Sequence, residues 1–319
     1  MIKVQQLSKH FGKVKAVDAI SFEVAEGENL VLLGTSGCGK TTTLKMLNRL
    51  IEPTSGEIWI GDKNILEQQA ETLRRGIGYV LQNTGLFPHY TIAENMAVVP
   101  KLLNWDDAKI NARTNELIEK LHLSADLLQS YPGQLSGGQQ QRVGLARALM
   151  ADPPVLLMDE PFGALDNVTR TKIQAEFKQL DELTRKTIIM VTHDVQEAFE
   201  LGNRICLMDR GKITQIGTPA ELLFNPTNDF VKDFLQGQRL QLELKVITLN
   251  DIWEQLPDTF AEAIEPSSVD TTVWSAMEKL KLSGAVIHIQ QPNSNEVKSL
   301  NFGQLMSAFN QYQNLKSAS

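Results

Sequence analysis

The chain has 319 residues, of which 42% are hydrophobic and 22% charged, a composition typical of globular proteins and unlike that of disordered or fibrous chains. Because single hydrophobic cores stop growing at about 250–300 residues, this length predicts a main domain and a smaller second one. Lys and Arg number 31 against 38 Asp and Glu, so the net charge of −7 gives no reason to expect a nucleic-acid partner. The two cysteines fit a reducing compartment.

The amino terminus and the apolar runs of the chain show how it relates to membranes. The amino terminus lacks an apolar stretch before a small-residue cleavage site, so no signal peptide is expected. No run of about 18 apolar residues is present. If a membrane is involved, another chain is therefore expected to cross it.

The first 60 residues predict strands, a glycine loop and a helix. Residues 4–7 and 20–24 read as half-exposed antiparallel strands, because apolar and polar side chains alternate in the second of them. Residues 30–33 are continuously apolar, as expected of a buried strand. Residues 41–50 then carry apolar side chains at helical spacing.

The rest of the chain alternates helical and strand patterns. Residues 95–130 are helical and polar, which predicts an inserted helical subdomain. Strand patterns return at 155–158, 187–191 and 204–208, each after a helical pattern, and predict a parallel, doubly wound core. The pattern thins at residues 236–238, so residues 239–319 are expected to form a second unit.

A glycine loop, Gly34–Thr41, lies between the buried strand and the helix and fits the pattern Gly, four residues, Gly-Lys-Ser/Thr. Its backbone N–H groups can surround phosphates, Lys40 can place a charge on the β and γ oxygens, and the Thr41 hydroxyl can bind Mg²⁺. The loop therefore predicts binding of ATP and Mg²⁺. The predicted ATP-binding residues are Gly34, Thr35, Ser36, Gly37, Cys38, Gly39, Lys40, Thr41 and Thr42.

Two carboxylates, Asp159 and Glu160, follow the apolar run 155–158. Ligand sites of α/β proteins lie at the carboxyl ends of strands, where these two residues are expected. Asp159 suits a magnesium site, and Glu160 suits the base that polarises an attacking water. Such general-base assistance contributes about 10²–10⁴-fold to a rate.

The segment Leu135–Gln139 reads Leu-Ser-Gly-Gly-Gln and resembles the signature peptide of the ATP-binding cassette (ABC) ATPases. Further landmarks of that family occur in order over residues 1–235: Phe11 for the adenine ring, Gln82, Asp166 and His193. The resemblance implies a P-loop NTPase core with an antiparallel β subdomain and a helical subdomain at about residues 90–150.

The resemblance also implies the roles of these residues. Glu160 and His193 would be catalytic, with His193 holding the γ-phosphate, and Phe11 and Gln82 would contact ATP. Thr41, Gln82 and Asp159 would hold the metal. The family works as a head-to-tail homodimer, in which each signature peptide closes over the ATP of the other subunit. The residues acting in trans would be Ser136, Gly137, Gly138, Gln139 and Asp166, with a helix beginning near Gln139.

Residues 73–82, 91–95 and 99–105 are similar to those of importers for quaternary amines and osmoprotectants such as glycine betaine, choline and carnitine. This similarity implies an ATP-hydrolysing subunit on the cytoplasmic face of the membrane, bound to integral permease subunits through the loop 82–89 and acting indirectly with an extracytoplasmic substrate-binding protein. An importer of a polyamine, sugar or amino acid is the alternative. A soluble cassette acting on ribosomes or DNA is disfavoured by the single cassette and the acidic balance.

The tail, residues 239–319, reads helix at 269–280, strand at 284–289, then turn and helix from 299. It is similar to a single degenerate cystathionine-β-synthase-type (CBS) module. A regulatory role and a packing or dimerisation role both stay open. Six Lys and Arg against nine Asp and Glu do not support a sensor of anionic lipid.

Overall fold

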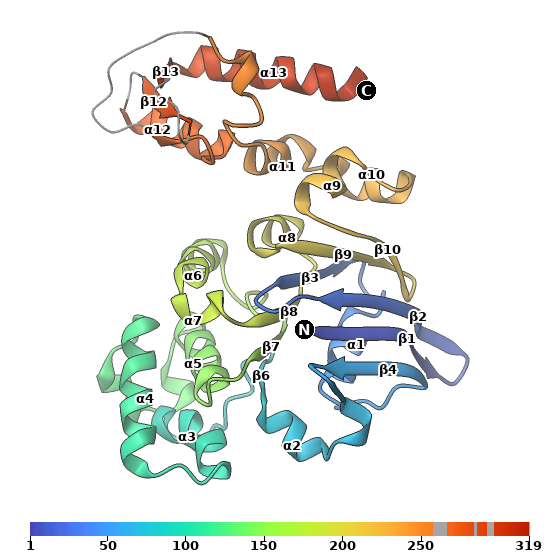
Figure 1. Cartoon of the computed structure of the whole chain (residues 1–319). Helices are drawn as coiled ribbons and strands as arrows, with labels where there is room; N and C mark the ends of the chain where they lie inside the picture. Colours follow the sequence, from blue (N-terminus) through green and yellow to red (C-terminus); the bar gives the residue numbers. More distant parts are fainter. Residues whose placement is uncertain (258–266, 284–285, 292–296, 319) are drawn as a thin grey trace. The chain divides into compact units, whose positions relative to one another are not determined.

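The computed structural model describes residues 1–257, 267–283, 286–291 and 297–318 (Figure 1). The chain forms two compact units, Met1–Ile216 and Gly217–Ser319. This division precedes the boundary expected near residue 236, because helices α9 (Pro219–Phe224) and α10 (Asp229–Gln236) make their contacts within the second unit.

The N-terminal unit contains two sheets. One has four antiparallel strands in the order β2-β1-β4-β5, and the other has six strands in the order β10-β9-β3-β8-β7-β6. Strands β9, β3, β8, β7 and β6 run parallel, which confirms the predicted parallel core. The strand bounds are β1 (Ile2–Phe11), β2 (Val14–Val24), β3 (Asn29–Gly34), β4 (Ser55–Ile60), β5 (Lys63–Asn64), β6 (Ile77–Val80), β7 (Val155–Asp159), β8 (Thr187–Val191), β9 (Arg204–Asp209) and β10 (Lys212–Gly217).

Burial explains which strands the sequence predicts well. Every residue of β7 and β8 is buried, as is expected when helices cover both faces of a parallel sheet. The end of β2, by contrast, alternates buried and exposed residues. Strand β4 was not predicted, because Pro53-Thr54-Ser55-Gly56 reads as a turn while the strand begins at Ser55.

The helices hold the six-stranded sheet and the antiparallel sheet together. Helix α1 contacts β3, β7 and β8 of one sheet and β2 of the other, and α3, α4 and α5 group beside β6 (Figure 1). A Thr91–Glu94 capping box starts α3. The helix bounds are α1 (Lys40–Leu47), α2 (Ala70–Arg75), α3 (Ile92–Leu102), α4 (Asp107–Lys120), α5 (Gly137–Leu149), α6 (Asn167–Gln179), α7 (Asp181–Thr184) and α8 (Val195–Leu201).

One hydrophobic core joins both sheets of this unit and α1. It includes Val4 of β1, Leu32 of β3, Leu44 of α1 and Val191 of β8, none of them more than 1% exposed. Well-packed interiors resist deformation. The turn between β3 and α1 is therefore fixed at both of its ends.

The C-terminal unit has a core of its own around Phe309, which is fully buried. Its sheet has the order β11-β12-β13, with β11 parallel to β12 and β12 antiparallel to β13. Strand β13 occupies part of the segment expected to be a turn, and residues 284–285 of the expected strand lie outside the described residues. The bounds are α11 (Arg239–Val246), β11 (Ser267–Ser268), α12 (Val273–Ser283), β12 (Ile287–Gln290), β13 (Val297–Leu300) and α13 (Phe302–Ala318).

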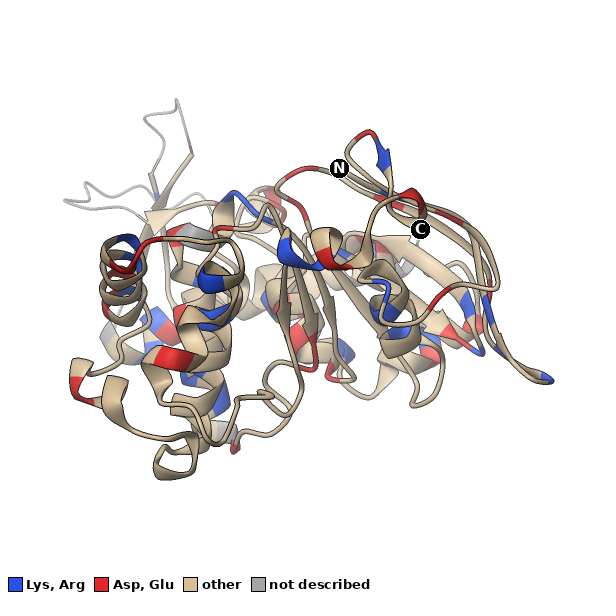
Figure 2. Ribbon diagram, turned by 90° about the horizontal axis from the view of Figure 1, so that it is seen from below, with Lys and Arg blue, Asp and Glu red and all other residues tan. Residues whose placement is uncertain are grey.

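Basic and acidic residues both occur on many of the helices and strands. Figure 2 shows blue and red segments interspersed over the visible part of the chain, with no large region of one sign. Within the described ranges, no helix combines the length and the apolar character that a membrane crossing requires.

Candidate active site

The carboxyl ends of four neighbouring strands, β3, β8, β7 and β6, meet at one edge of the six-stranded sheet. The glycine loop follows β3, and Asp159 and Glu160 lie at the end of β7. His193 lies just beyond β8 and Gln82 just beyond β6. The fold therefore gathers four separate sequence motifs at the edge where open α/β sheets bind ligands.

The glycine loop is an anion cradle with its lysine folded inward. At Gly39, where φ is 107°, a Cβ atom would lie 2.4 Å from the carbonyl oxygen of Ala16, so only glycine fits. Lys40 is 6% exposed, and its Nζ donates hydrogen bonds to the carbonyl oxygens of Gly34 (2.8 Å) and Thr35 (2.9 Å). The ammonium group is thus held inside the loop by carbonyl oxygens, where a phosphate can take their place.

The other predicted loop residues differ in their exposure. Thr35, Ser36 and Gly37 are exposed, whereas Cys38 is buried in the core and Thr42 is half-buried on α1. The exposed half of the loop is thus the part that a nucleotide can reach first.

Thr41 and Asp159 are brought together, as the metal prediction requires. The Thr41 hydroxyl donates a hydrogen bond of 2.9 Å to Oδ1 of Asp159, and burial raises the pKa of this carboxyl above its usual range. No group of three or more His, Cys, Asp or Glu that could hold a metal occurs in the described part of the chain. The donors fit Mg²⁺, which proteins commonly bind through one or two side chains and the phosphates of the substrate.

Glu160 is the centre of a second cluster. Its Oε2 accepts a hydrogen bond of 2.9 Å from Nε2 of Gln82 and lies 3.2 Å from Nδ1 of His193. Gln82 therefore contacts the carboxylate here, and among the described residues no hydrogen bond joins it to Thr41 or Asp159, the other two predicted metal ligands. Glu160 has a φ of 44°, in the left-handed region, which costs a residue with a side chain about 1–2 kcal/mol. With this backbone conformation, the Glu160 carboxylate reaches Gln82 and His193.

The residues that hold the loop of His193 were missed from the sequence. The Thr192 hydroxyl donates a hydrogen bond of 2.5 Å to Oε2 of Glu197, and Asp194 caps α8 by accepting from the backbone N–H groups of Gln196 and Glu197. Only the Asp-x-x-Glu spacing of Asp194 and Glu197, typical of a helix start, signalled them.

Replacing Glu197 with Gln is expected to make the fold less sensitive to rising pH. Burial raises the pKa of Glu197 from 4.5 to about 7, so the folded chain keeps a proton that the unfolded chain has already lost. The stability that this proton contributes is complete below about pH 4.5 and is lost as the pH rises through 7. Relative to the wild type, the variant should therefore gain up to about 3 kcal/mol between pH 5 and pH 8.

Urea unfolding of both proteins at these two pH values measures the effect. Glu119→Gln, a change at an exposed position on α4, serves as the matched control. Its unfolding free energy relative to the wild type should be the same at both pH values. An equal difference in unfolding free energy between Glu197→Gln and the wild type at both pH values would contradict the assignment.

The signature peptide begins α5. Ser136 caps this helix and forms a capping box with Gln139, so the helix begins at Gly137, two residues before the expected start. A Cβ on Gly138 would lie 2.8 Å from Cγ2 of Thr169 on α6. Among the described residues, no hydrogen bond or ion pair joins Ser136–Gln139 to the glycine loop. The signature thus packs on α6 rather than on the phosphate cradle of its own chain.

Asp166 lies at the start of α6, beside the signature. Its Oδ1 accepts hydrogen bonds of 3.1 Å from the backbone N–H groups of Val168 and Thr169. Hydrogen bonds from the Thr169 side chain and backbone are the main causes that lower the pKa of Asp166. The exposed carboxylate therefore stays ionised at neutral pH.

Phe11 lies at the end of β1, in the antiparallel sheet. Its side chain is 50% exposed, and Nζ of Lys9 lies 5.2 Å from its ring centre. No hydrogen bond or ring contact in the described part of the chain links Phe11 to the glycine loop. An exposed ring with a neighbouring cation presents an open face for stacking.

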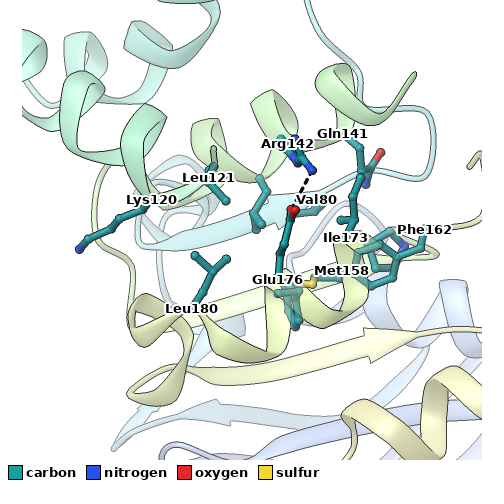
Figure 3. A pocket seen from close by; sticks show the side chains of 13 residues that line it. Val80, Lys120, Leu121, Gln141, Arg142, Met158, Phe162, Ile173, Glu176 and Leu180 are labelled. Atoms are coloured by element: carbon teal, nitrogen blue, oxygen red, sulfur yellow. Dashed lines mark hydrogen bonds and ion pairs between the residues drawn. The ribbon is translucent and has the colours of Figure 1, made fainter. Parts of the chain in front are cut away.

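A small apolar cavity with room of about 20 Å³ lies between α5, α6 and the ends of β6 and β7 (Figure 3). The 2.7 Å ion pair between Arg142 and Glu176 lies in its wall. None of the predicted site residues lines the cavity, and its size admits about one water. It is a packing feature between α5, α6 and the sheet and not the nucleotide site.

Comparison with known proteins identifies the family. The family model described as "ABC transporter" matches residues 17–163. The osmoprotectant import ATP-binding protein OsmV of Salmonella typhimurium is 48% identical over 274 residues, which are 84% of this chain and 72% of OsmV. The glycine betaine uptake system ATP-binding protein YehX of Escherichia coli is 49% identical over 252 residues, 79% of this chain and 81% of YehX.

The chain belongs to the ABC transporter ATP-binding proteins.

Two further comparisons define how far the likeness extends. The glycine betaine/carnitine/choline transport ATP-binding protein OpuCA of Bacillus subtilis is 53% identical over 241 residues, 75% of this chain but only 63% of OpuCA. The dimeric, ADP- and phosphate-bound structure of the ATP-binding cassette MJ0796 is 33% identical, with a TM-score of 0.61, and covers 68% of this chain and 98% of that chain. The ABC cassette fold is thus confirmed, and the ATP-binding motifs lie within it.

Proposed function

We propose that the chain is the ATP-hydrolysing subunit of an ABC importer for quaternary amines and osmoprotectants. The proposal that the chain hydrolyses ATP rests on Glu160. This residue contacts both Gln82 and His193 and lies beside the glycine loop that holds Lys40. The printed names of OsmV, OpuCA and YehX support the substrate class.

Binding of ATP would begin at the glycine loop. Lys40 would exchange the two carbonyl oxygens that it contacts for β and γ oxygens of the nucleotide, and the loop N–H groups would donate to the same phosphates. Thr41, Asp159 and Gln82 would hold Mg²⁺. When bound, the metal neutralises charge on the phosphate oxygens.

Glu160 would then accept the proton of the attacking water. Gln82 and His193 both contact Oε2, which leaves Oε1 without a hydrogen bond in the described part of the structure. The His193 side chain is 64% exposed, so the ring can turn from Glu160 to the γ-phosphate and hold it. The two residues together would orient the water in line with the bond that breaks.

A second copy would complete each site. Ser136, Gly137, Gly138 and Gln139 present a capped helix start, which favours an anion. Because this start does not contact its own glycine loop, a head-to-tail homodimer would place it and Asp166 over the ATP of the partner. The dimeric structure of the MJ0796 cassette supports this arrangement.

A groove beside Gln82 would receive the permease. It has a volume of about 310 Å³ and is lined by Tyr79, Leu81, Phe87, Val99 and Arg147, among others. Leu81 and Phe87 expose 36% and 47% of their surface, so an apolar helix of a membrane subunit has side chains to contact. The subunit would thus lie on the cytoplasmic face of the membrane and act with a substrate-binding protein only through the permease.

The C-terminal unit would be a single CBS-like module. The order β11, α12, β12, β13, α13 around one small sheet supports this assignment. Deletion of residues 239–319 tests a regulatory role, because transport should then lose its dependence on osmolarity.

Phe11→Ala is expected to weaken ATP binding by about 5- to 150-fold, because an aromatic–base stack contributes roughly 1–3 kcal/mol. Phe11→Tyr should bind as the wild type does, since only the ring is needed. Titration with ATP and GTP measures both, and GTP should be affected to the same extent. Unchanged affinity of Phe11→Ala for both nucleotides would remove Phe11 from the site.

Reconstitution tests the proposal as a whole. The chain is purified from membranes together with its permease, and ATP hydrolysis is measured in liposomes while different solutes are supplied with their binding protein. Stimulation by glycine betaine, choline or carnitine is the expected result. Stimulation by a polyamine, sugar or amino acid alone would contradict the substrate class, and the absence of ATP hydrolysis would contradict the enzyme.

A further inference from the structure

Two loops leave neighbouring strands of the sheet toward the candidate site. The loop after β7 leads to Asp166, and the loop after β8 carries His193. Near the sheet the two loops touch, because Nδ1 of His193 lies 3.2 Å from Oε2 of Glu160. In the proposed dimer, His193 serves the chain's own ATP and Asp166 the ATP of the partner, so a second link between the loops would connect the two sites.

Arg170 makes this second link. It lies in the first turn of α6, and its Nη2 donates a hydrogen bond of 3.1 Å to the carbonyl oxygen of Leu165, the residue before Asp166. Its Nη1 lies 3.5 Å from Oδ2 of Asp194, the residue after His193. The two Nη groups of the planar guanidinium are held apart at a fixed distance and each reaches one partner, whereas a lysine offers a single nitrogen for both.

The Asp194 end of the link is rigid. Oδ1 of Asp194 accepts hydrogen bonds from the backbone N–H groups of Gln196 (2.9 Å) and Glu197 (3.2 Å), and its own N–H donates to the Thr192 hydroxyl at 3.0 Å. A carboxylate held in this way cannot move without the loop. Any displacement of the His193 loop therefore acts on Arg170.

The cluster also has an unused donor and an unused acceptor. Nε of Arg170 and Oε1 of Glu197 are both buried, and neither has a hydrogen-bond partner among the described residues. Buried polar atoms are normally paired. The positive charge of Arg170 acts on the carboxyl of Glu197, so the two groups are neighbours, and each has a free position for a new partner when the cluster rearranges.

We propose that Arg170 is a positioning residue that couples the His193 loop to the Asp166 turn, and so makes hydrolysis at one ATP site depend on the other; this rests on the proposed function. When the His193 ring turns to a γ-phosphate, Asp194 moves with it and Arg170 pulls on the Leu165 carbonyl. The Asp166 turn, which faces the partner, shifts in response. Loss of Arg170 should uncouple the sites and leave each able to bind ATP.

Steady-state ATP hydrolysis of the full chain tests the proposal with Arg170→Gln, Asp194→Asn and the double variant. Asparagine still caps α8, so Asp194→Asn removes only the charge. Each single change should lower kcat by about 5- to 10-fold and bring the Hill coefficient for ATP toward one, with ATP binding at low protein concentration unchanged. The double variant should be no worse than either single variant, because both remove the same link.

Glu176→Gln is the matched control, because it breaks the half-buried ion pair between Glu176 of α6 and Arg142 of α5 without touching either loop. It should keep the cooperativity of the wild type. If Arg170→Gln does not fold, Arg170→Lys keeps the charge and should still lose cooperativity, since one shorter, flexible ammonium does not replace the two nitrogens that the rigid guanidinium places on Leu165 and Asp194.

Retained cooperativity in Arg170→Gln or Arg170→Lys, or multiplying losses of kcat in the double variant, would overturn the proposal. A wild-type protein that hydrolyses ATP without cooperativity would instead contradict the dimeric site on which it rests. Hydrogen exchange gives a readout that does not depend on hydrolysis. ATP should slow exchange at residues 164–166 in Glu160→Gln but not in Glu160→Gln/Arg170→Gln, and equal slowing in both would also overturn the proposal.

Discussion

Glu160→Gln is expected to lower kcat for ATP hydrolysis by about 10²–10⁴-fold, the usual contribution of a general base. The amide keeps the size of the carboxylate and can still accept from Gln82 and His193, which contact Oε2 in the wild type. It cannot take the proton of the attacking water. ATP binding should therefore survive, and an ATP-bound dimer should accumulate.

Single-turnover kinetics and size-exclusion chromatography with ATP measure these two effects. The matched control is Glu119→Gln on the exposed face of α4, which should hydrolyse ATP as the wild type does. A Glu160→Gln variant with a normal kcat, or one that stays monomeric with ATP, would assign the base to another residue.

Lys40→Ala is expected to weaken ATP binding by about 10- to 100-fold. The Lys40 ammonium is buried in the loop and bound to the carbonyl oxygens of Gly34 and Thr35, so it is poised to exchange them for phosphate oxygens. Hydrogen bonds from charged groups contribute about 1.5–3 kcal/mol, which corresponds to this range of affinity.

Isothermal titration with ATP measures the loss. Lys63→Ala, which removes an exposed lysine from β5, is the control and should leave the affinity unchanged. Thermal unfolding shows whether Lys40→Ala keeps the fold. A folded Lys40→Ala that binds ATP normally would show that the loop amides alone hold the phosphates.

The sequence predicted the elements whose burial is nearly uniform. Strands β3, β7 and β8 contain continuous apolar runs, at residues 30–33, 155–158 and 188–191, because helices cover the sheet. Strands β4 and β13 were missed, because they are partly exposed and adjacent to turn residues. Their pairing depends on neighbours that are distant in the chain.

The site was predictable where a motif and a strand end coincide. Gly34–Thr41, Asp159 and Glu160 follow apolar runs, so their position at the sheet edge follows from topology. The start of α5 was placed too late, because glycine disfavours helix while the Ser136 capping box overrides that preference. The link from Arg170 to Asp194 could not be predicted, since it depends on how α6 and α8 are placed by the sheet.

The composite site is the central claim, and mixing two inactive variants tests it most directly. Lys40→Ala damages the glycine loop. Gly137→Asp damages the signature without a clash, because a Cβ on Gly137 would meet only Cδ2 of Leu165 at 3.9 Å. In a head-to-tail dimer, a mixed pair keeps one intact site, formed by the glycine loop of the Gly137→Asp chain and the signature of the Lys40→Ala chain.

The measurement is therefore the rate of ATP hydrolysis in an equimolar mixture of Lys40→Ala and Gly137→Asp. At an ATP concentration well below the Kd of Lys40→Ala, we expect activity that neither variant has alone. It should stay below the wild-type rate, because the damaged site no longer supports the intact one, and rise more steeply than linearly with protein concentration as mixed dimers form. A mixture as inactive as its two components would contradict the account, because it would place the whole ATP site within one chain.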